Sequence, residues 1–384
     1  MLGYYQLLLE IAIDSERGAV KRLEAMESCR DFVDWLGPDA SSSVFILLDN
    51  PTDLMSVSAV SRSWRRLVIA NRFCKALCFR MCPEFSNLTF VVEACSALTS
   101  EAGSSSCAEW KNLEREHRVY SYLSRSITSV VRKRDCIFRA IRASSTDNFP
   151  IESIENTLVP SNHVGMRSSY WSSEGQSDPE VPETLTYRLL SELCVVNEIL
   201  IQPFEAYFQP ENPIYSAKTV RFRMGHSRLP LETSIGIQGE ASADNNYEWT
   251  YISPEFHMLQ ENTLQSFKLP RPAVCVGGIL QIELLGRVQV QQSDGLYYIC
   301  VCHVKVLGHS LKTRHFDVDF IKASREMVLT WRPEAEDCSS DDSEAQDSPV
   351  GHVTCVTSRT AMAPPLSEYF LGVAESTSDD EPLL

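Results

Sequence analysis

The chain has 384 residues, enough for two ordinary domains, and its 43% hydrophobic and 22% charged residues exclude wholesale disorder. The formal net charge is −16, of which −11 falls in residues 333–384, where 12 acidic side chains face one basic one. The remainder is close to neutral, which excludes a protein that coats nucleic acid by neutralising phosphates, and we expect no nucleic-acid partner.

Residues 1–25 precede the first organised pattern and are followed by a second methionine, Met26. The stretch Leu2–Ile13 is apolar, but Gln6 and Glu10 interrupt it and no basic residue precedes it. It is too short to cross a bilayer and lacks the positive start of a secretory signal. We interpret residues 1–25 as an optional N-terminal extension, and we expect no membrane partner.

Residues 26–95 carry apolar side chains at helical spacing. A first run ends at Pro51, after which Thr52-Asp53 can cap a second helix, and the same spacing continues to Met81. The pattern predicts three short helices with a small shared core, a kind of unit that a partner commonly completes.

Residues 96–142 predict a linker with one helix. It begins with a flexible Gly/Ser-rich joint, Glu101–Ser106. A helix follows, because the apolar and aromatic side chains from Trp110 to Leu123 fall on one face of it.

Residues 143–332 predict strands. Thr184–Leu189 and Thr219–Met224 alternate between apolar and polar side chains, as half-buried strands do, and Val195–Gln202 is almost entirely apolar. Strands with no helical periods between them favour an antiparallel β-sandwich over a parallel sheet, so the fold class is α+β multidomain.

A hairpin is predicted within this region. Ser293-Asp294-Gly295 separates the apolar runs Leu280–Gln291 and Leu296–Leu307. Because glycine adopts the positive φ that tight turns need, we expect the two runs to pair with each other.

The tail, residues 333–384, is too polar and too acidic to bury a core. Runs such as Ser339–Glu344 and Ser376–Glu381 are made of serine, threonine and acidic residues. We expect an acidic disordered tail.

The sequence lacks the patterns of common catalytic sites. It has no Gly-rich phosphate loop, no GxSxG and no HExxH, so we expect no enzyme and no cofactor. The 13 cysteines include no CxxC pair, which predicts reduced thiols in the cytoplasm or nucleus. Two groups could suggest a metal, but we interpret both as core packing. They are Cys74, Cys78 and Cys82 at helical spacing, and Cys300, Cys302 and His303 on a predicted strand.

The segment from Leu36 to Leu67 resembles an F-box. The matching residues are Leu36-Gly37-Pro38-Asp39, Val44-Phe45-Ile46-Leu47, Asp53-Leu54, Val57, Val60-Ser61-Arg62-Ser63-Trp64 and Arg65-Arg66-Leu67. The spacing from Pro38 to Trp64 follows the family pattern without a gap. The resemblance, closest to plant-type members, implies a three-helix module that docks on the Skp adaptor of a cullin–RING ubiquitin ligase.

The resemblance also implies an adaptor-binding set, in which Trp64 holds the helices together. The set is Leu36, Pro38, Phe45, Leu48, Leu54, Val60 and Trp64. Plain core packing is the alternative for each aliphatic position. Two departures from the family pattern, Gly37 within the usual Leu-Pro pair and the polar run Ser41–Ser43, predict weaker adaptor binding because apolar anchors are fewer.

A second segment is similar to the opening of a galactose-binding-like (discoidin-type) jelly roll. The residues are Ala143-Ser144-Ser145-Thr146-Asp147-Asn148, Asn156-Thr157-Leu158 and Ser169-Tyr170-Trp171-Ser172-Ser173-Glu174-Gly175. The resemblance implies one jelly-roll β-sandwich over residues 143–332, with any ligand at loops on one end.

Four loops are candidates for that end, and four side chains could line a ligand surface. The loops are Asn162–Tyr170, Tyr207–Ala217, Gly239–Trp249 and Leu311–Phe316. The side chains are Trp249, Tyr247, Arg221 and Arg223, with ordinary sandwich packing as the alternative.

Together these observations predict the substrate-recognition subunit of an SCF-type (Skp–cullin–F-box) ubiquitin ligase. The F-box would bind the Skp adaptor, the sandwich would bind a protein target, and the protein itself would catalyse nothing. Two alternatives stay open: a glycan- or small-ligand-reading F-box protein, and an interaction scaffold with a degenerate F-box.

Overall fold

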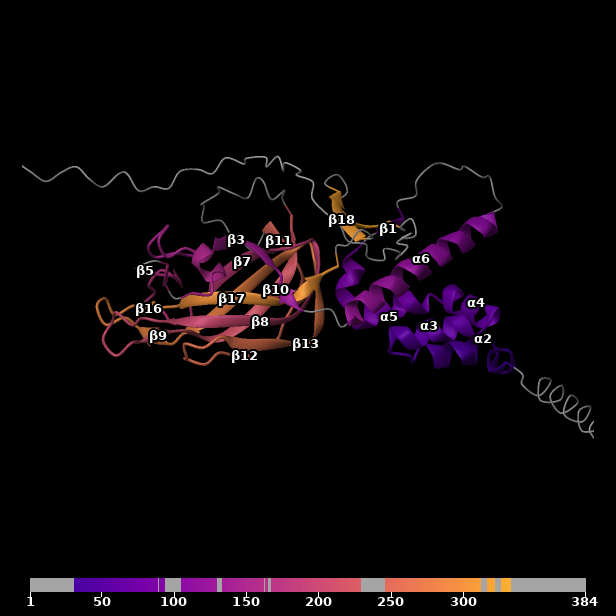
Figure 1. Ribbon diagram of the computed structural model, residues 1–384, viewed down its shortest axis with the longest axis horizontal. Helices are drawn as coiled ribbons and strands as arrows, with labels where there is room; N and C mark the ends of the chain where they lie inside the picture. The colour runs from indigo at the N-terminus through magenta and orange to yellow at the C-terminus, as the bar shows by residue number, and fades with distance from the viewer. Residues whose placement is uncertain are drawn as a thin grey trace, which may run out of the picture. The chain divides into compact units, whose positions relative to one another are not determined.

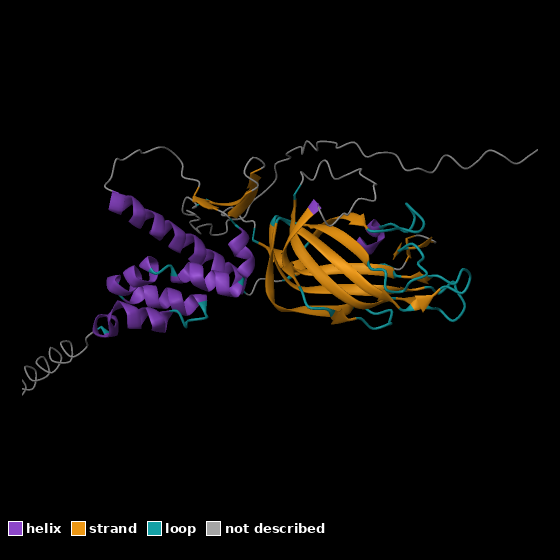
Figure 2. Cartoon of the chain, turned by 180° about the vertical axis from the view of Figure 1, so that it is seen from behind, coloured by secondary structure: helices purple, strands orange, loops and turns teal. Residues whose placement is uncertain are grey.

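A computed structural model of the chain describes residues 31–88, 90–93, 105–129, 133–161, 163–164, 167–228, 246–311, 316–321 and 326–332 (Figures 1 and 2). The predicted N-terminal extension and acidic tail lie outside these residues. Within the described ranges, no helix is long and apolar enough to cross a membrane.

The α-helices described all precede residue 129, and we call them, with the short 3-10 helix η1, the helical module. They are α2 (Phe32–Phe45), α3 (Pro51–Val60), α4 (Arg62–Ala70), α5 (Phe73–Met81), η1 (Pro83–Asn87) and α6 (Ser105–Thr128). Residues 31–83 therefore form four short helices where the sequence predicted three.

Local sequence explains where α3 begins. The side chain of Asn50 accepts a hydrogen bond from the backbone N–H of Thr52 at 2.9 Å, and Pro51 is the first helical residue, where its missing N–H leaves nothing unsatisfied. The predicted cap at Thr52-Asp53 was therefore wrong by two residues.

The helix α2 is interrupted near its middle. Gly37 has φ 75° and ψ 169°, and Pro38 follows it. Few residues other than glycine adopt this conformation. The departure from the usual Leu-Pro pair thus coincides with a kink in the helix.

Twelve of the described strands form two antiparallel sheets, which confirms the predicted sandwich. One sheet has the order β11-β10-β14-β7-β3, with β12 paired to β10, and the other has the order β13-β8-β17-β2, with β6 paired to β17 and β9 paired to β8. The bounds of the first sheet are β3 (Ile137–Ala143), β7 (Glu183–Leu189), β10 (Ala217–Ser227), β11 (Tyr247–Ile252), β12 (Phe256–His257) and β14 (Ile279–Arg287). Those of the second are β2 (Arg134–Asp135), β6 (Trp171–Ser172), β8 (Leu193–Glu205), β9 (Ile214–Tyr215), β13 (Gln265–Val276) and β17 (Cys300–Ser310).

The sandwich core lies between these sheets. Tyr187, Phe222 and Ile282 come from the first sheet, Ile199 and Val304 from the second, and all are buried in one cluster. Because side chains alternate between the two faces of a strand, one face of each sheet packs into this cluster, as the patterns of β7 and β10 predicted.

The predicted hairpin is confirmed only at its tip. The short strands β15 (Gln289–Val290) and β16 (Tyr297–Tyr298) pair across the turn, and Gly295 has φ 75°. The longer strands β14 and β17, however, belong to different sheets. The chain crosses between the sheets here, which an apolar pattern on both sides of a turn does not reveal.

The sandwich also has different limits from the predicted 143–332. Strands β2 and β3 already belong to it, so it begins near Arg134. Strands β18 (Phe316–Ile321) and β19 (Glu326–Trp331) leave it and form a separate sheet, in which β19 pairs in parallel with β1 (Phe90–Glu93). The remaining short elements are β4 (His163–Val164), β5 (Arg167–Ser168) and the 3-10 helix η2 (Ile154–Leu158).

A second apolar cluster joins the helical module to the strands. Leu77, Phe85 and Leu123 of the module share it with Val195 of β8 and Leu329 of β19. The helical module therefore completes its core with residues far away in the sequence.

Candidate functional site

Apolar side chains are exposed along α2, α3 and the turn between them. Leu47 is 74% exposed and Val60 61%, and Leu36, Val44 and Ile46 are exposed as well. Exposed apolar side chains that gather in one short segment commonly mark a binding surface. We call these five residues the exposed apolar set.

The predicted adaptor-binding residues divide between this surface and the interior. Leu36, Pro38 and Val60 are exposed, and Leu48 is half-buried. Phe45 and Leu54 are buried in the cluster that the module shares with the strands. Phe45 and Leu54 can hold the exposed residues in position but cannot contact a partner directly.

Trp64 contacts the start and the end of α2. Its ring lies 5.2 Å from that of Phe45 between centroids, and its Nε1–H donates a hydrogen bond to the carboxylate of Asp31. Asp31 also accepts a hydrogen bond from the backbone N–H of Val33 at 3.1 Å. The role of Asp31 was missed, because an acidic residue just before a helix predicts only a local cap.

Arg80 fixes the turn that exposes Ile46 and Leu47. Its guanidinium donates to the carbonyl oxygens of Ile46 and Leu48, the latter at 2.6 Å, and lies 3.4 Å from a carboxylate oxygen of Asp49. This contact spans more than thirty residues of sequence, and no local pattern predicted it.

The cysteines of the two groups singled out in the sequence are buried thiols, as predicted. Cys74, Cys78 and Cys82 lie in the helical cluster, and burial raises the pKa of Cys74 and of Cys82 to about 12. Cys300 and Cys302 are also buried. All nine cysteines in the described ranges are free, and no group of three His, Cys, Asp or Glu side chains there could hold a metal ion.

The four predicted ligand residues of the sandwich lie on two neighbouring strands of the first sheet. Arg221 and Arg223 alternate with core residues of β10, and both contact Glu283 at 2.5 Å. The pairing of β10 with β11 shifts register between Met224 and Gly225: Met224 pairs with the core residue Tyr251, whereas Gly225 pairs with Trp249 and Ser227 with Tyr247. Because paired residues lie on the same face of a sheet, this register places Tyr247 and Trp249 on the face that carries Arg221 and Arg223.

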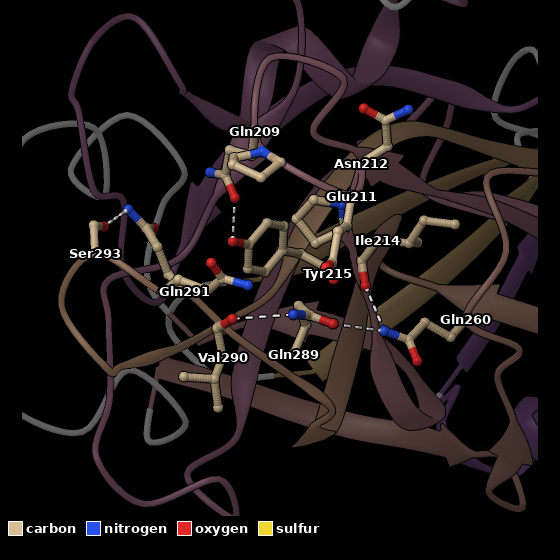
Figure 3. Close-up of a pocket in the computed structure, with 13 residues that line it drawn as sticks. Gln209, Glu211, Asn212, Ile214, Tyr215, Gln260, Gln289, Val290, Gln291 and Ser293 are labelled. Carbon is tan, nitrogen blue, oxygen red and sulfur yellow. Dashed lines mark hydrogen bonds between the residues drawn. The ribbon is translucent and has the colours of Figure 1, made fainter.

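A cavity of about 550 Å³ lies at one end of the sandwich (Figure 3). It is lined by Gln209, Pro210, Glu211, Asn212, Pro213, Ile214, Tyr215, Gln260, Gln289, Val290, Gln291, Gln292 and Ser293. The predicted loop Tyr207–Ala217 supplies one wall. The other wall, from Gln289 to Ser293, was predicted only as a hairpin.

Hydrogen bonds organise the amide side chains of this cavity (Figure 3). The Tyr215 hydroxyl donates to Gln209 Oε1 at 2.6 Å, and Gln260 Nε2 donates to the carbonyl oxygen of Ile214 at 2.9 Å and to Gln289 Oε1 at 3.1 Å. Because amides both donate and accept, such a lining can match the polar groups of a peptide backbone or a sugar.

Strand β8 connects the two candidate sites. Its first residues, Leu193 and Val195, lie in the cluster shared with the helices, and its last residue, Glu205, pairs with Ile214 of the cavity wall. Twelve residue steps of strand extend about 40 Å, so the cavity lies far from the end of β8 that contacts the helices.

The chain is 48% identical over 290 residues to a curated F-box protein of Arabidopsis thaliana, which covers 73% of this chain and 77% of the relative. No protein-family model matches the chain.

Among solved structures, the sandwich is similar to galactose-binding-like modules. A family 32 carbohydrate-binding module from a family 31 glycoside hydrolase of Clostridium perfringens is 12% identical, covers 44% of this chain and 90% of its own, and gives a TM-score of 0.30. A putative chitobiase fragment from Bacteroides thetaiotaomicron is 8% identical, covers 48% and 99%, and gives 0.33. Likeness at this level carries no information about a ligand.

Proposed function

Since the chain belongs to the F-box protein family, we propose that it is the substrate-recognition subunit of an SCF-type ubiquitin ligase. The helical module binds the Skp adaptor, which joins it to the cullin, and the sandwich binds a protein target. The protein performs no chemistry in this scheme: it raises the effective concentration of the target beside the ubiquitin-charged enzyme.

The observation that carries the proposal is the exposed apolar set. Five large apolar side chains stay in contact with water between Leu36 and Val60. Covering a fully exposed side chain of this size contributes on the order of 1.5–3 kcal/mol, and covering these five, which are 38% to 74% exposed, contributes part of that for each, so the set favours a partner of this segment. Phe45 and Leu54 beneath it, and Arg80 beside the turn, hold the exposed side chains in place.

The distance along β8 supports separate binding sites for the adaptor and for the target. The helical module and the cavity contact opposite ends of one long strand. A target bound at the cavity would leave the exposed apolar set free for the adaptor.

The test is co-precipitation of the full chain with the Skp adaptor and a cullin. The double variant Leu47→Glu/Val60→Glu places two charges in the exposed apolar set, and we expect it to lose adaptor capture while its thermal midpoint stays unchanged. Ile252→Glu is the matched control, because Ile252 is 55% exposed but lies on β11 of the sandwich.

Capture that survives the double variant would contradict the placement of the binding surface. No capture even by the unchanged protein would contradict the ligase proposal, and an interaction scaffold with a degenerate F-box would then be favoured.

A further inference from the structure

A smaller pocket of about 210 Å³ adjoins the amide-lined cavity and shares Gln209, Tyr215 and Gln291 with it. Its walls include the rings of Tyr170, Phe204 and Phe208. We call this the aromatic pocket. Its volume lies below the 300–1,000 Å³ that is usual for small-molecule sites, which favours a single long side chain as occupant.

The aromatic residues are packed against one another: Phe204 is buried, and exposed rings lie beside it. The rings of Tyr170 and Phe204 are stacked with centroids 3.9 Å apart, and Phe208 lies 6.2 Å from Phe204. Phe208 is 55% exposed, and its neighbour Tyr207 is exposed too. Open aromatic rings beside a pocket offer faces to an incoming group.

Residues 148–152, another part of the pocket wall, expose further apolar side chains. Phe149 and Ile151 are exposed, and the residues beside them, Asn148 and Glu152, line the pocket. The pocket therefore opens onto a surface with exposed apolar residues, as protein-binding sites commonly do.

Two carboxylates line the pocket and have only neutral partners. The Tyr170 hydroxyl donates to Glu152 Oε1 at 2.6 Å, and Asn148 Nδ2 donates to Glu152 Oε2 and to Asp147 Oδ2, each at 3.2 Å. In the part of the chain that the structure describes, neither carboxylate forms an ion pair. Burial and the nearby negative charge of Asp294 raise the pKa of Asp147, so a third carboxylate lies near these two.

From this geometry we infer that the aromatic pocket takes the basic side chain, lysine or arginine, of an extended polypeptide segment. The rings of Tyr170 and Phe208, which are not buried, would contact the cation through their faces, and Asp147 and Glu152 would accept its charge-assisted hydrogen bonds. The residues flanking the basic one would lie in the adjoining cavity, whose amide side chains match a peptide backbone. This inference rests on the proposed function, since it names the class of target that the sandwich binds.

The test uses the immobilised full chain and degenerate peptide pools, acetylated and amidated, that differ only in a fixed central residue. We expect pools with central arginine or lysine to be retained at least about tenfold more than pools with their neutral counterparts, citrulline or norleucine. Equal retention of charged and neutral pools would overturn the inference.

Variants locate the site. Glu152→Gln keeps an acceptor for the Tyr170 hydroxyl but loses the charge, and with Asp147→Asn it should reduce retention of the basic pools about tenfold. Phe208→Ala should reduce it by several-fold without a change in thermal midpoint, because the ring is half-exposed. Glu155→Gln is the matched control, since Glu155 is exposed on the same segment and does not line the pocket. Unchanged retention by Glu152→Gln and Asp147→Asn would place the site elsewhere and overturn the inference.

Adaptor capture is measured on the same preparations. A protein that captures the adaptor but retains no basic pool overturns this inference and leaves the ligase role intact. Selective retention without adaptor capture supports the pocket and contradicts the ligase role. Binding of neutral oligosaccharides on a glycan array, unaffected by the charge variants, would also overturn the peptide assignment.

Discussion

The helical module and the sandwich differ in how they bury their apolar side chains. The sandwich closes its core with its own two sheets, and residues such as Phe222 and Ile199 are completely buried by it. The module leaves Leu47 and Val60 in water and shares its buried cluster with β8 and β19. A region that buries its own core can be stable without a partner. A region that leaves large apolar side chains exposed gains stability when a partner covers them. Substitutions in the buried core of the sandwich should therefore act on stability, and substitutions in the exposed apolar set of the module should act on binding.

The largest effect is expected inside the sandwich, at Arg287. Its side chain is fully buried, lies 2.5 Å from Glu183, and donates to Ser173 Oγ at 2.8 Å and to the carbonyl oxygen of Glu174 at 2.9 Å. Arg287→Met leaves the buried carboxylate of Glu183 without its positively charged partner. It should lower the free energy of unfolding by about 3–5 kcal/mol, measured by urea denaturation.

The exposed pair Arg228–Glu248 is the control for Arg287. Its atoms are 3.9 Å apart and both side chains are more than half exposed, so Arg228→Met should change the free energy of unfolding by less than about 1 kcal/mol. Equal effects of the two substitutions would show that the burial of an ion pair does not determine how much its loss lowers the free energy of unfolding.

A pH effect is expected from the helical module, at His117. The side chain is 8% exposed, and burial, with Arg65 and Arg118 nearby, lowers its pKa to about 4. Between this value and the ordinary pKa of about 6.5, the unfolded chain binds a proton that the folded chain excludes. This contribution to stability is complete above about pH 6.5 and falls by about 3 kcal/mol as the pH drops to about 4.

The measurement compares urea denaturation at neutral and acid pH. His117→Gln should lose less stability on acidification than the unchanged protein, whereas His257→Gln, at an exposed position on β12, should not differ from it. The same acid loss in all three proteins would assign it to carboxylates elsewhere.

The contact between the two regions can be weakened at Arg271. Its guanidinium, on β13, binds both carboxylate oxygens of Glu84, at 2.5 and 3.1 Å, and lies over the ring of Tyr251. Glu84 is buried in η1. Arg271→Leu removes both of these hydrogen bonds from the buried carboxylate and should cost about 2 kcal/mol.

Hydrogen exchange would locate the loss at this contact. We expect amides of α5 and η1 to lose protection, while those of β10 and β14 keep it. Arg271→Leu/Glu84→Gln should recover part of the loss, since it also removes the buried negative charge that Arg271 balances. A loss spread equally over module and sandwich would mean that the two form one cooperative unit.

The sequence predicted what depends on neighbours along the chain. Alternation identified β7 and β10, and the F-box pattern identified the segment from Leu36 to Leu67. It could not divide that segment, because Phe45 and Val60 are both apolar and only tertiary contacts bury one and expose the other. The pairing of β1 with β19 escaped prediction because more than two hundred residues separate these strands. The aromatic pocket was predicted only in part: Tyr170 and Phe208 belong to two of the predicted loops, but the other walls come from segments far away in the sequence.

The smallest effect is expected at Gly295, in the turn beside the cavity. Its φ of 75° favours glycine, and an added Cβ would meet no atom within 4 Å. Gly295→Ala should therefore cost only backbone strain, about 1 kcal/mol, and Gly295→Asn less, because asparagine adopts positive φ more readily. Urea denaturation would measure both. A loss above about 2 kcal/mol for alanine would mean that more than backbone conformation holds this turn. The expected order, alanine worse than asparagine, would mean that the turn's shape comes from its own backbone, in keeping with a region that is complete without a partner.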